Sequence, residues 1–245
     1  MTMPLAHGFK GWLTAISSLV FALTASAPIA AQPQTLPVED SDAWELRKEE
    51  GNIRVYTMDK NDSSFQAFKA EALLDAPIDA VVAVMNNPQS CIEWLLNCTE
   101  SYAVGKSSFH DRYVYSVNNM PWPVTDRDYV LNIQTRGNKA TGEVVVNMSA
   151  APDMQATRSN RVRVEQSDTR YRFISEDDTT RMVWLQHTDP NGTLPGWLVN
   201  SLLVDIPLKS TKELERIAGL ERYQKATLVY DDEGRLMDVT AAENN

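Results

Sequence analysis

The sequence has few of the residues on which most metal and acid–base chemistry depends. Its 245 residues include three histidines and only two cysteines, Cys91 and Cys98, and no cluster of His and Cys has the spacing of a zinc site. The glycine-rich phosphate loops, the GxSxG turn and the HExxH helix are also missing from the sequence. We therefore expect no metal, no cofactor and none of these common enzyme types.

Positive charge is also scarce. The chain has 23 Lys and Arg against 33 Asp and Glu, which gives a formal net charge of −10 at pH 7. Nucleic acids and anionic membrane surfaces bind basic faces, so neither is expected to bind this chain over its whole surface. We expect no nucleic-acid partner, and we expect a monomer that contacts membranes at most transiently.

One uncharged apolar run, residues 12–25, follows the basic residue Lys10 and precedes small residues that end at Ala31. The run is shorter than the roughly 20 apolar residues of a membrane span. It therefore predicts a secretory signal peptide over residues 1–31, with an uncleaved anchor as the alternative. The interpretation implies export, with a periplasmic location, and leaves residues 32–40 as a linker.

The two cysteines lie seven residues apart in SCIEWLLNC. Export permits a disulfide, but an unbroken helix would hold their Cα atoms roughly 10 Å apart, beyond the usual limit of about 7 Å. A Cys91–Cys98 bond therefore requires the helix to end near Leu95 and the chain to fold back at Asn97. We predict this bond, and two buried free thiols are the alternative.

The remaining pattern mixes helices with many short strands. In EVVVNMS, Val144, Val146 and Met148 share one face, which is typical of antiparallel strands with one covered face. A late apolar helix over residues 196–220 would cover that face, giving an α+β fold. Helices are also predicted for residues 41–50, 76–87 and 88–96. Strands are predicted for residues 53–58, 65–74, 101–105, 112–118, 128–135, 143–149, 161–165, 170–175 and 181–188. The tail is predicted to form a hairpin around residues 232–234, which either packs on the surface or docks a partner.

Two specific motifs carry a family resemblance. PWPVTDRDYV (residues 121–130) is followed some sixty residues later by DPNGTLPGWLVN (residues 189–200). Together with IRVYT, EWLLNCTES and DIPLKSTKELERI they resemble START domains, the lipid-transfer domains related to the steroidogenic acute regulatory protein. The resemblance implies the helix-grip fold, a curved antiparallel sheet wrapped around a long C-terminal helix with an internal apolar tunnel. Residues 41–220 would form this domain and residues 221–245 a C-terminal extension.

The resemblance implies an exported lipid-binding or lipid-transfer protein that holds one hydrophobic molecule. The alternative is a cyclase-like or hydrolase-like enzyme of the same wider superfamily, and a third hypothesis is a module whose groove docks a peptide. We expect no catalysis, because His187, beside a strand end, is predicted to hydrogen-bond and His110 lies in a polar loop. Pro207 would kink the late helix, either as part of a gate or as a simple break.

Pro121 and Pro123 exclude MPWPV from the interior of a sheet, because each lacks a backbone donor. Trp122 is predicted to pack between them as a wedge. Arg127 and Asp128 follow and resemble the Arg-Asp pair of START domains, which implies a structural role that holds the connection by hydrogen bonds.

The predicted tunnel is lined from the strands and from one stripe of the late helix. The resemblance places the aliphatic Val114 and Ile133 where cholesterol-binding relatives have a buried acid and an arginine, so the polar end of the ligand needs another partner. The alternative is an ordinary packed core without a void. Within the predicted lining, Val145 would replace Val146 if the register of that strand shifted by one residue. The predicted lining residues are Val114, Leu131, Ile133, Val146, Trp184, Val199, Leu203 and Ile206.

Overall fold

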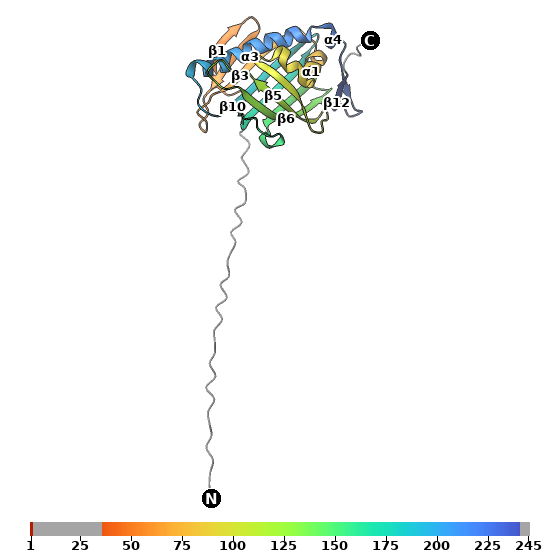
Figure 1. The fold of residues 1–245 in the computed structure, drawn as a ribbon. Coiled ribbons are helices and arrows are strands. Elements are labelled where there is room, and N and C mark those ends of the chain that lie inside the picture. Colours follow the sequence, from red (N-terminus) through yellow and green to blue (C-terminus); the bar gives the residue numbers. More distant parts are fainter. Residues whose placement is uncertain (2–35, 241–245) are drawn as a thin grey trace. The chain divides into compact units, whose positions relative to one another are not determined.

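Strands dominate the computed structural model, which describes Met1 and residues 36–240 (Figure 1). Apart from Met1, the predicted signal segment lies outside the described residues. Ten strands form one sheet in the order β1-β2-β3-β10-β9-β7-β6-β5-β4, antiparallel throughout except that the short β8 pairs with β6 in parallel. The strands are β1 Glu45–Glu50, β2 Ile53–Met58, β3 Ala67–Leu74, β4 Cys98–Val104, β5 Asp111–Asn118, β6 Arg127–Asn138, β7 Glu143–Ala150, β8 Val162–Arg163, β9 Gln166–Glu176 and β10 Thr179–Asp189.

The long helix α3, Gly196–Ala218, lies along one face of this sheet with α1, Ile78–Asn86, beside it (Figure 1). Two single-turn helices, α2 at Cys91–Trp94 and α4 at Glu221–Gln224, complete the α-helical elements of the described chain. This arrangement confirms the predicted α+β helix-grip fold. No helix among the described residues is long and apolar enough to span a membrane.

The helix predicted for residues 41–50 is wrong, because Glu45–Glu50 forms the edge strand β1. All six of its residues are exposed, so a helix here would have had no apolar face to bury. The backbone instead pairs with β2, Glu50 opposite Ile53, through a two-residue turn. Gly51 has φ +60° in that turn, a conformation that glycine adopts without strain. The hairpin therefore overrides the helix-forming residue types of this segment.

The other predicted elements are present, although the strand expected over residues 161–165 is reduced to the two residues of β8. The tail forms a hairpin of β11, Thr227–Tyr230, and β12, Leu236–Thr240. Leu228 and Leu236 are buried in the main core, and the Leu228 amide donates to Asp79 of α1 at 2.7 Å. Leu236 approaches β6 so closely that a Cβ on Gly137 would lie 2.8 Å from it. The extension is therefore an integral part of the core.

The predicted linker is also bound to the sheet in its described part. The Glu39 carboxylate pairs with the guanidinium of Arg172 on β9, and its carbonyl accepts a hydrogen bond of 3.1 Å from Lys69 on β3. Trp44 donates from its indole nitrogen to the carbonyl of Val38 at 3.0 Å. Residues 38–44 therefore pack as an ordered cover on the outer face of these strands.

Candidate functional site

A cavity lies between the inner face of the sheet and the first half of α3. The space open to the centre of a water molecule is about 130 Å³. The sheet lines it with Phe68, Ser116, Asn118, Tyr129, Leu131, Met148, Ser167, Thr169, Tyr171, Trp184, Gln186 and Thr188. The helix adds Val199, Leu202, Leu203 and Ile206, and the connections add Phe65, Gln66, Leu95, Met120, Pro190 and Leu194.

The volume of this cavity limits the size of ligand that it can hold without a change in the structure. An engineered apolar cavity of about 150 Å³ takes up one benzene molecule. The present cavity therefore fits a ring-sized apolar group, and a longer molecule requires its wall to move outward. The wall with the least packing is the first half of α3, where Val199, Leu202 and Leu203 are only half-buried.

Five of the eight predicted lining residues border the cavity, namely Leu131, Trp184, Val199, Leu203 and Ile206. The other three, Val114, Ile133 and Val146, are buried in the adjoining core and do not line it. Val146 faces this core with an exposed fraction of 1%, so the register places it, and not Val145, on the inner face. Val114 lies opposite Leu131 and Ile133 lies opposite Met148, so the cavity stops beside these residues and not short of their level in the sheet.

Aromatic packing explains where the cavity stops. The ring of Trp94, from α2, lies 6.4 Å from both Tyr171 and Trp184, and these two rings stack 4.9 Å apart. Phe68 meets Trp184 edge-on at 5.0 Å. Rings in these arrangements pack densely, so they fill the space between the sheet and the helices. This aromatic cluster, Phe68, Trp94, Tyr171 and Trp184, forms the floor of the cavity.

A buried arginine lies beside the floor. Arg112 of β5 lies opposite Ile133 and donates to the carbonyl oxygen of Phe109 at 2.8 Å, the hydroxyl of Thr135 at 3.0 Å and the carbonyl of Met85 at 3.4 Å. Burial lowers the pKa of Arg112 to about 10. Met85 lies in the last turn of α1, where the partial negative charge of the helix end favours a cation. Arg112 therefore links β5 and β6 to the end of α1.

On β5 and β6, three polar lining residues were missing from the prediction, namely Ser116, Asn118 and Tyr129. Ser116 and Asn118 follow Val114 at two-residue steps on β5, and Tyr129 precedes Leu131 on β6, so strand alternation already placed them on the inner face. Burial raises the pKa of Tyr129 to about 12, although nearby Arg127 acts in the opposite direction. The phenol thus keeps its proton at neutral pH.

Arg127 and Asp128 do not contact each other, because neighbouring side chains of a strand point to opposite faces. Arg127 donates from its guanidinium to the carbonyl oxygens of Thr125 at 2.6 Å, Pro190 at 3.1 Å and Asn191 at 3.0 Å. These bonds tie the start of β6 to the connection between β10 and α3. Arg127 thereby holds the loop from which the cavity helix begins.

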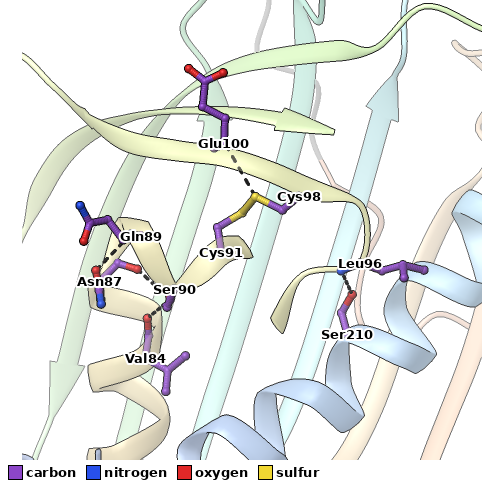
Figure 2. Close-up of a disulfide and its surroundings, with 9 residues drawn as sticks. All are labelled: Val84, Asn87, Gln89, Ser90, Cys91, Leu96, Cys98, Glu100 and Ser210. Atoms are coloured by element: carbon purple, nitrogen blue, oxygen red, sulfur yellow. Dashed lines mark hydrogen bonds between the residues drawn. A yellow bond between two sulfur atoms is a disulfide. The ribbon is translucent and has the colours of Figure 1, made fainter. Parts of the chain in front are cut away.

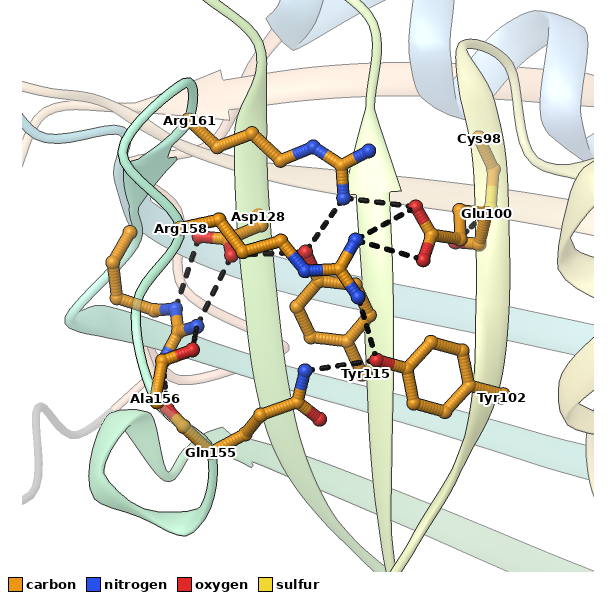
Figure 3. A network of polar contacts seen from close by, with 10 residues as sticks. Cys98, Glu100, Tyr102, Tyr115, Asp128, Gln155, Ala156, Arg158 and Arg161 are labelled. Atoms are coloured by element: carbon orange, nitrogen blue, oxygen red, sulfur yellow. Dashed lines mark hydrogen bonds and ion pairs between the residues drawn. The ribbon is translucent and has the colours of Figure 1, made fainter.

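Asp128 lies on the outer face in a network of polar side chains, which Figure 3 shows. Its two carboxylate oxygens each accept a 3.0 Å bond from the guanidinium of Arg163, and Oδ2 also accepts from the Tyr115 hydroxyl at 3.0 Å. The pair is almost completely buried. Because both charges have partners, this cluster connects β5, β6 and β8 without leaving a buried charge unpaired.

Glu100 of β4 extends the same network (Figure 3). It pairs with Arg158 at 3.0 Å and with Arg161 at 2.8 Å, and Arg161 also donates to the Tyr115 hydroxyl at 2.7 Å. Partial burial raises the pKa of Glu100, but hydrogen bonds from Arg161 and Arg158 outweigh it, so that the pKa lies below its usual value. The outer network therefore has charges of both signs, each with a partner.

The prediction that Trp122 packs as a wedge is wrong. Its side chain is 91% exposed, and the flanking Pro121 and Pro123 are exposed as well. The prolines thus offer no buried surface for the ring to cover, and the connection projects into solvent. A second tryptophan, Trp197 in the first turn of α3, is 60% exposed.

The disulfide between Cys91 and Cys98 is present, as predicted (Figure 2). Helix α2 ends at Trp94, Leu95 is extended, and Asn97 has φ 68°, so that the two Cα atoms come within 6.0 Å. The Leu96 amide donates to the hydroxyl of Ser210 on α3 at 3.0 Å. The bond therefore fixes a chain reversal that places Leu95 in the cavity wall.

Neither described histidine lines the cavity. His187 points to the face of β10 opposite Gln186, and its Nε2 lies 3.2 Å from the carbonyl oxygen of Phe65. Burial lowers the pKa of His187. His110 is half-buried, with Nδ1 3.1 Å from the carbonyl oxygen of Thr135. Within the described ranges, no group of three or more His, Cys, Asp or Glu side chains could hold a metal ion.

A sheet that holds a long helix over a mainly apolar cavity defines the helix-grip class of fold. The chain belongs to the START domain family, whose pattern matches residues 29–225. An uncharacterized Pseudomonas aeruginosa protein, PA1579, is 28% identical over 176 residues, which cover 71% of this chain and 86% of that protein.

Solved structures show the same fold. A STAR-related lipid transfer protein fragment from Xanthomonas axonopodis matches with a TM-score of 0.67 and 27% identity, covering 73% of this chain and all of the fragment. Human STARD10 matches with a TM-score of 0.64 and 19% identity, covering 74% of each chain. Human StAR-related lipid transfer protein 5 has the same TM-score at 15% identity and covers 74% of this chain and 88% of its own.

Proposed function

We propose that this protein binds one hydrophobic, lipid-like molecule in the cavity between the sheet and α3 and carries it shielded from water. The observation that carries the proposal is the mainly apolar cavity itself, with its aromatic floor and its half-buried helical wall. Membership of the START family and the likeness to a bacterial STAR-related lipid transfer protein support the same conclusion. Burial of the ligand would contribute about 25 cal/mol for each Å² of apolar surface removed from water.

Entry of a ligand would require the first half of α3 to move outward. The helix continues through Pro207, which is buried, but proline has no amide hydrogen to donate to the carbonyl of Leu203 one turn earlier. Residues before Pro207 face the cavity, and residues after it, such as Leu214 and Ile217, are buried in the core. A hinge at this position would open the cavity and leave the core intact.

The lining favours binding over catalysis. Among the described residues, the cavity wall contains no carboxylate, imidazole, thiol or amine that could serve as a general base or as an activated nucleophile. We therefore propose a carrier and not an enzyme. Export to the periplasm is part of the proposal, supported by the apolar run over residues 12–25 and by the disulfide, which persists in oxidising compartments.

Mass spectrometry of lipid extracted from the purified full-length protein tests this function. We expect about one hydrophobic molecule per chain, recovered unchanged after incubation, and none from the variant Leu203→Trp, whose larger side chain would fill the cavity. A chemically altered molecule would show an enzyme instead. Absence of extractable lipid, combined with refusal of added lipid by folded wild-type protein, would contradict the carrier and leave a peptide-docking module.

A further inference from the structure

We propose that the cavity selects a neutral lipid whose polar end is a hydroxyl group, and that Asn118 and Tyr129 bind this hydroxyl. The inference rests on the proposed function and names the chemistry of the ligand. Three features of the cavity support it: an uncharged wall, unpaired polar groups mostly on one side, and the position of those groups relative to the aromatic floor.

The wall of the cavity is uncharged. Within the part of the chain that the structure describes, no Asp, Glu, Lys, Arg or His lines it. Arg127, on the same face of β6 as Tyr129, is already bonded to three carbonyl oxygens. Arg112 does not line the cavity and has its own partners. A carboxylate or phosphate inside would be a buried charge without a counter-ion, which is strongly unfavourable. The cavity therefore discriminates against fatty acids and phospholipid head groups.

The polar groups on the β9–β10 side mostly satisfy one another. The hydroxyl groups of Ser167 and Thr188 lie 2.8 Å apart, and the Gln186 amide donates to Thr188 at 3.0 Å. The Gln186 oxygen accepts from the indole of Trp184 at 3.2 Å. Thr169 is left with one free hydroxyl. This side thus has little hydrogen-bonding capacity left for a ligand.

The β5–β6 side differs, because its polar groups have no protein partner. The side-chain amide of Asn118 makes no hydrogen bond to any described residue, and its oxygen Oδ1 is buried from solvent. No described residue bonds to the hydroxyl of Tyr129, which lies opposite Ser116 in the register, one pair from Asn118 on the same face. Buried polar groups almost always have a partner, so an unpaired cluster facing a cavity points to a ligand group that completes it.

The two groups call for a partner that both donates and accepts. Tyr129 is protonated at neutral pH, since burial raises its pKa to about 12, and it can donate a hydrogen bond. The carbonyl oxygen of Asn118 can only accept one. A hydroxyl would accept from Tyr129 and donate to Asn118, whereas an ether or ester oxygen would leave Asn118 unpaired. That loss is expected to weaken binding on the order of tenfold.

The position of the pair indicates which end of the ligand enters first. Asn118 is the last residue of β5, and Tyr129 lies near the start of β6, beside the connection between the two strands. The floor residues Tyr171 and Trp184 lie level with Thr135, six residues further along β6, as the registers of β10, β9, β7 and β6 show. The apolar end would therefore enter first and pack on the floor, and the hydroxyl would remain near the strand ends.

Fluorescence titration of the full-length protein with four probes, which share one slender apolar tail and differ in their head group, tests the inference. The probes are a C18 conjugated-tetraene alcohol, its methyl ether, the corresponding carboxylic acid and the phosphate monoester, all at pH 8. We expect the alcohol to bind tightest, the ether about tenfold weaker, and the two anions at least about 100-fold weaker. An acid or phosphate that binds as tightly as the alcohol would overturn the neutral head group, and an equally tight ether would overturn the hydroxyl.

Substitutions of single residues test which side chains bind the hydroxyl of the ligand. Asn118→Leu should reduce affinity for the alcohol about tenfold and leave affinity for the ether within twofold. Tyr129→Phe should reduce affinity for both about tenfold, because the ether oxygen also accepts from the Tyr129 hydroxyl. Tyr113→Phe is the matched control, because it removes a phenol hydroxyl from the outer face of β5, outside the cavity, and it should change neither affinity. Equal effects of Tyr129→Phe and Tyr113→Phe would overturn the assignment, even if Asn118→Leu failed to fold.

The outcomes separate this inference from the proposed function. If the extracted lipid is hydrophobic but charged, or if all four probes bind equally, the protein is still a carrier and the head-group inference is wrong. If no lipid is extracted and no probe binds to folded protein, the proposed function is wrong and the inference falls with it.

Discussion

The two faces of strands β5 and β6 handle polar groups in opposite ways. On the outer face, Asp128, Tyr115 and Glu100 are bonded to three arginines, and every charge has a partner (Figure 3). On the inner face, one residue away along the same strands, Asn118 and Tyr129 have none among the described residues. The satisfied polar groups of the outer face hold the fold together, whereas the unpaired ones of the inner face are those that we propose to bind the ligand.

The largest expected effect comes from breaking the outer network. Asp128→Ala leaves the guanidinium of Arg163 buried without its counter-ion and should lower the free energy of unfolding by about 3–5 kcal/mol, measured by urea denaturation. Glu100→Ala, in the more exposed part of the same network, is the control and should cost about 1 kcal/mol or less. Equal losses would show that burial of the charge does not matter here. Neither variant should change ligand affinity of the folded fraction.

Removal of the disulfide should have the next largest effect. The double variant Cys91→Ser/Cys98→Ser should lose about 2 kcal/mol of unfolding free energy, because the bond closes a short loop, and reductant should shift wild type by a similar amount. Loss of the bond should affect the cavity wall, to which Leu95 contributes, and should leave the outer polar network intact. Intact mass after alkylation of non-reduced protein checks the premise, and two modified thiols would refute it.

Two substitutions on one helix test whether the inner face encloses a cavity. Leu214→Trp, in the packed half of α3, should destabilise by about 1–3 kcal/mol. Leu203→Trp, in the cavity half, should leave the thermal midpoint nearly unchanged and block uptake of a fluorescent lipid. If Leu203→Trp destabilises as much as Leu214→Trp, the inner face is an ordinary packed core.

The smallest effect concerns pH. Burial lowers the pKa of His187 in the folded state, so the unfolded chain binds this proton first as pH falls. Stability from this residue is therefore present above about pH 6.5, the unperturbed pKa, and decreases below it by at most about 1.4 kcal/mol per pH unit. Unfolding midpoints between pH 5.5 and 8 measure the slope. His187→Gln should flatten it and His110→Gln, which keeps His187, should not; an unchanged slope in His187→Gln would contradict the assignment.

Much of the fold could be predicted because alternation and turn residues are local signals. The strands around Val144–Met148 and the helix before Ala218 follow directly from their periodicity, and the chain reversal at Asn97 follows from the reach of a disulfide. Strand β1 was mispredicted because its residue types favour a helix, and only pairing with β2 reveals the edge strand. Trp122 was mispredicted because exposure depends on what surrounds a loop.

By itself the sequence determined the class of the fold, the faces of its strands and the cysteine pair, since each depends on residues close together along the chain. Only the tertiary structure decided where the cavity ends, because Trp94, Tyr171 and Trp184 come from three separate elements and meet at one level of the sheet. For the same reason Val114, Ile133 and Val146 became core while Asn118 and Tyr129 became cavity wall. Whether a buried polar atom has a partner is a property of packing in three dimensions, which no local pattern contains.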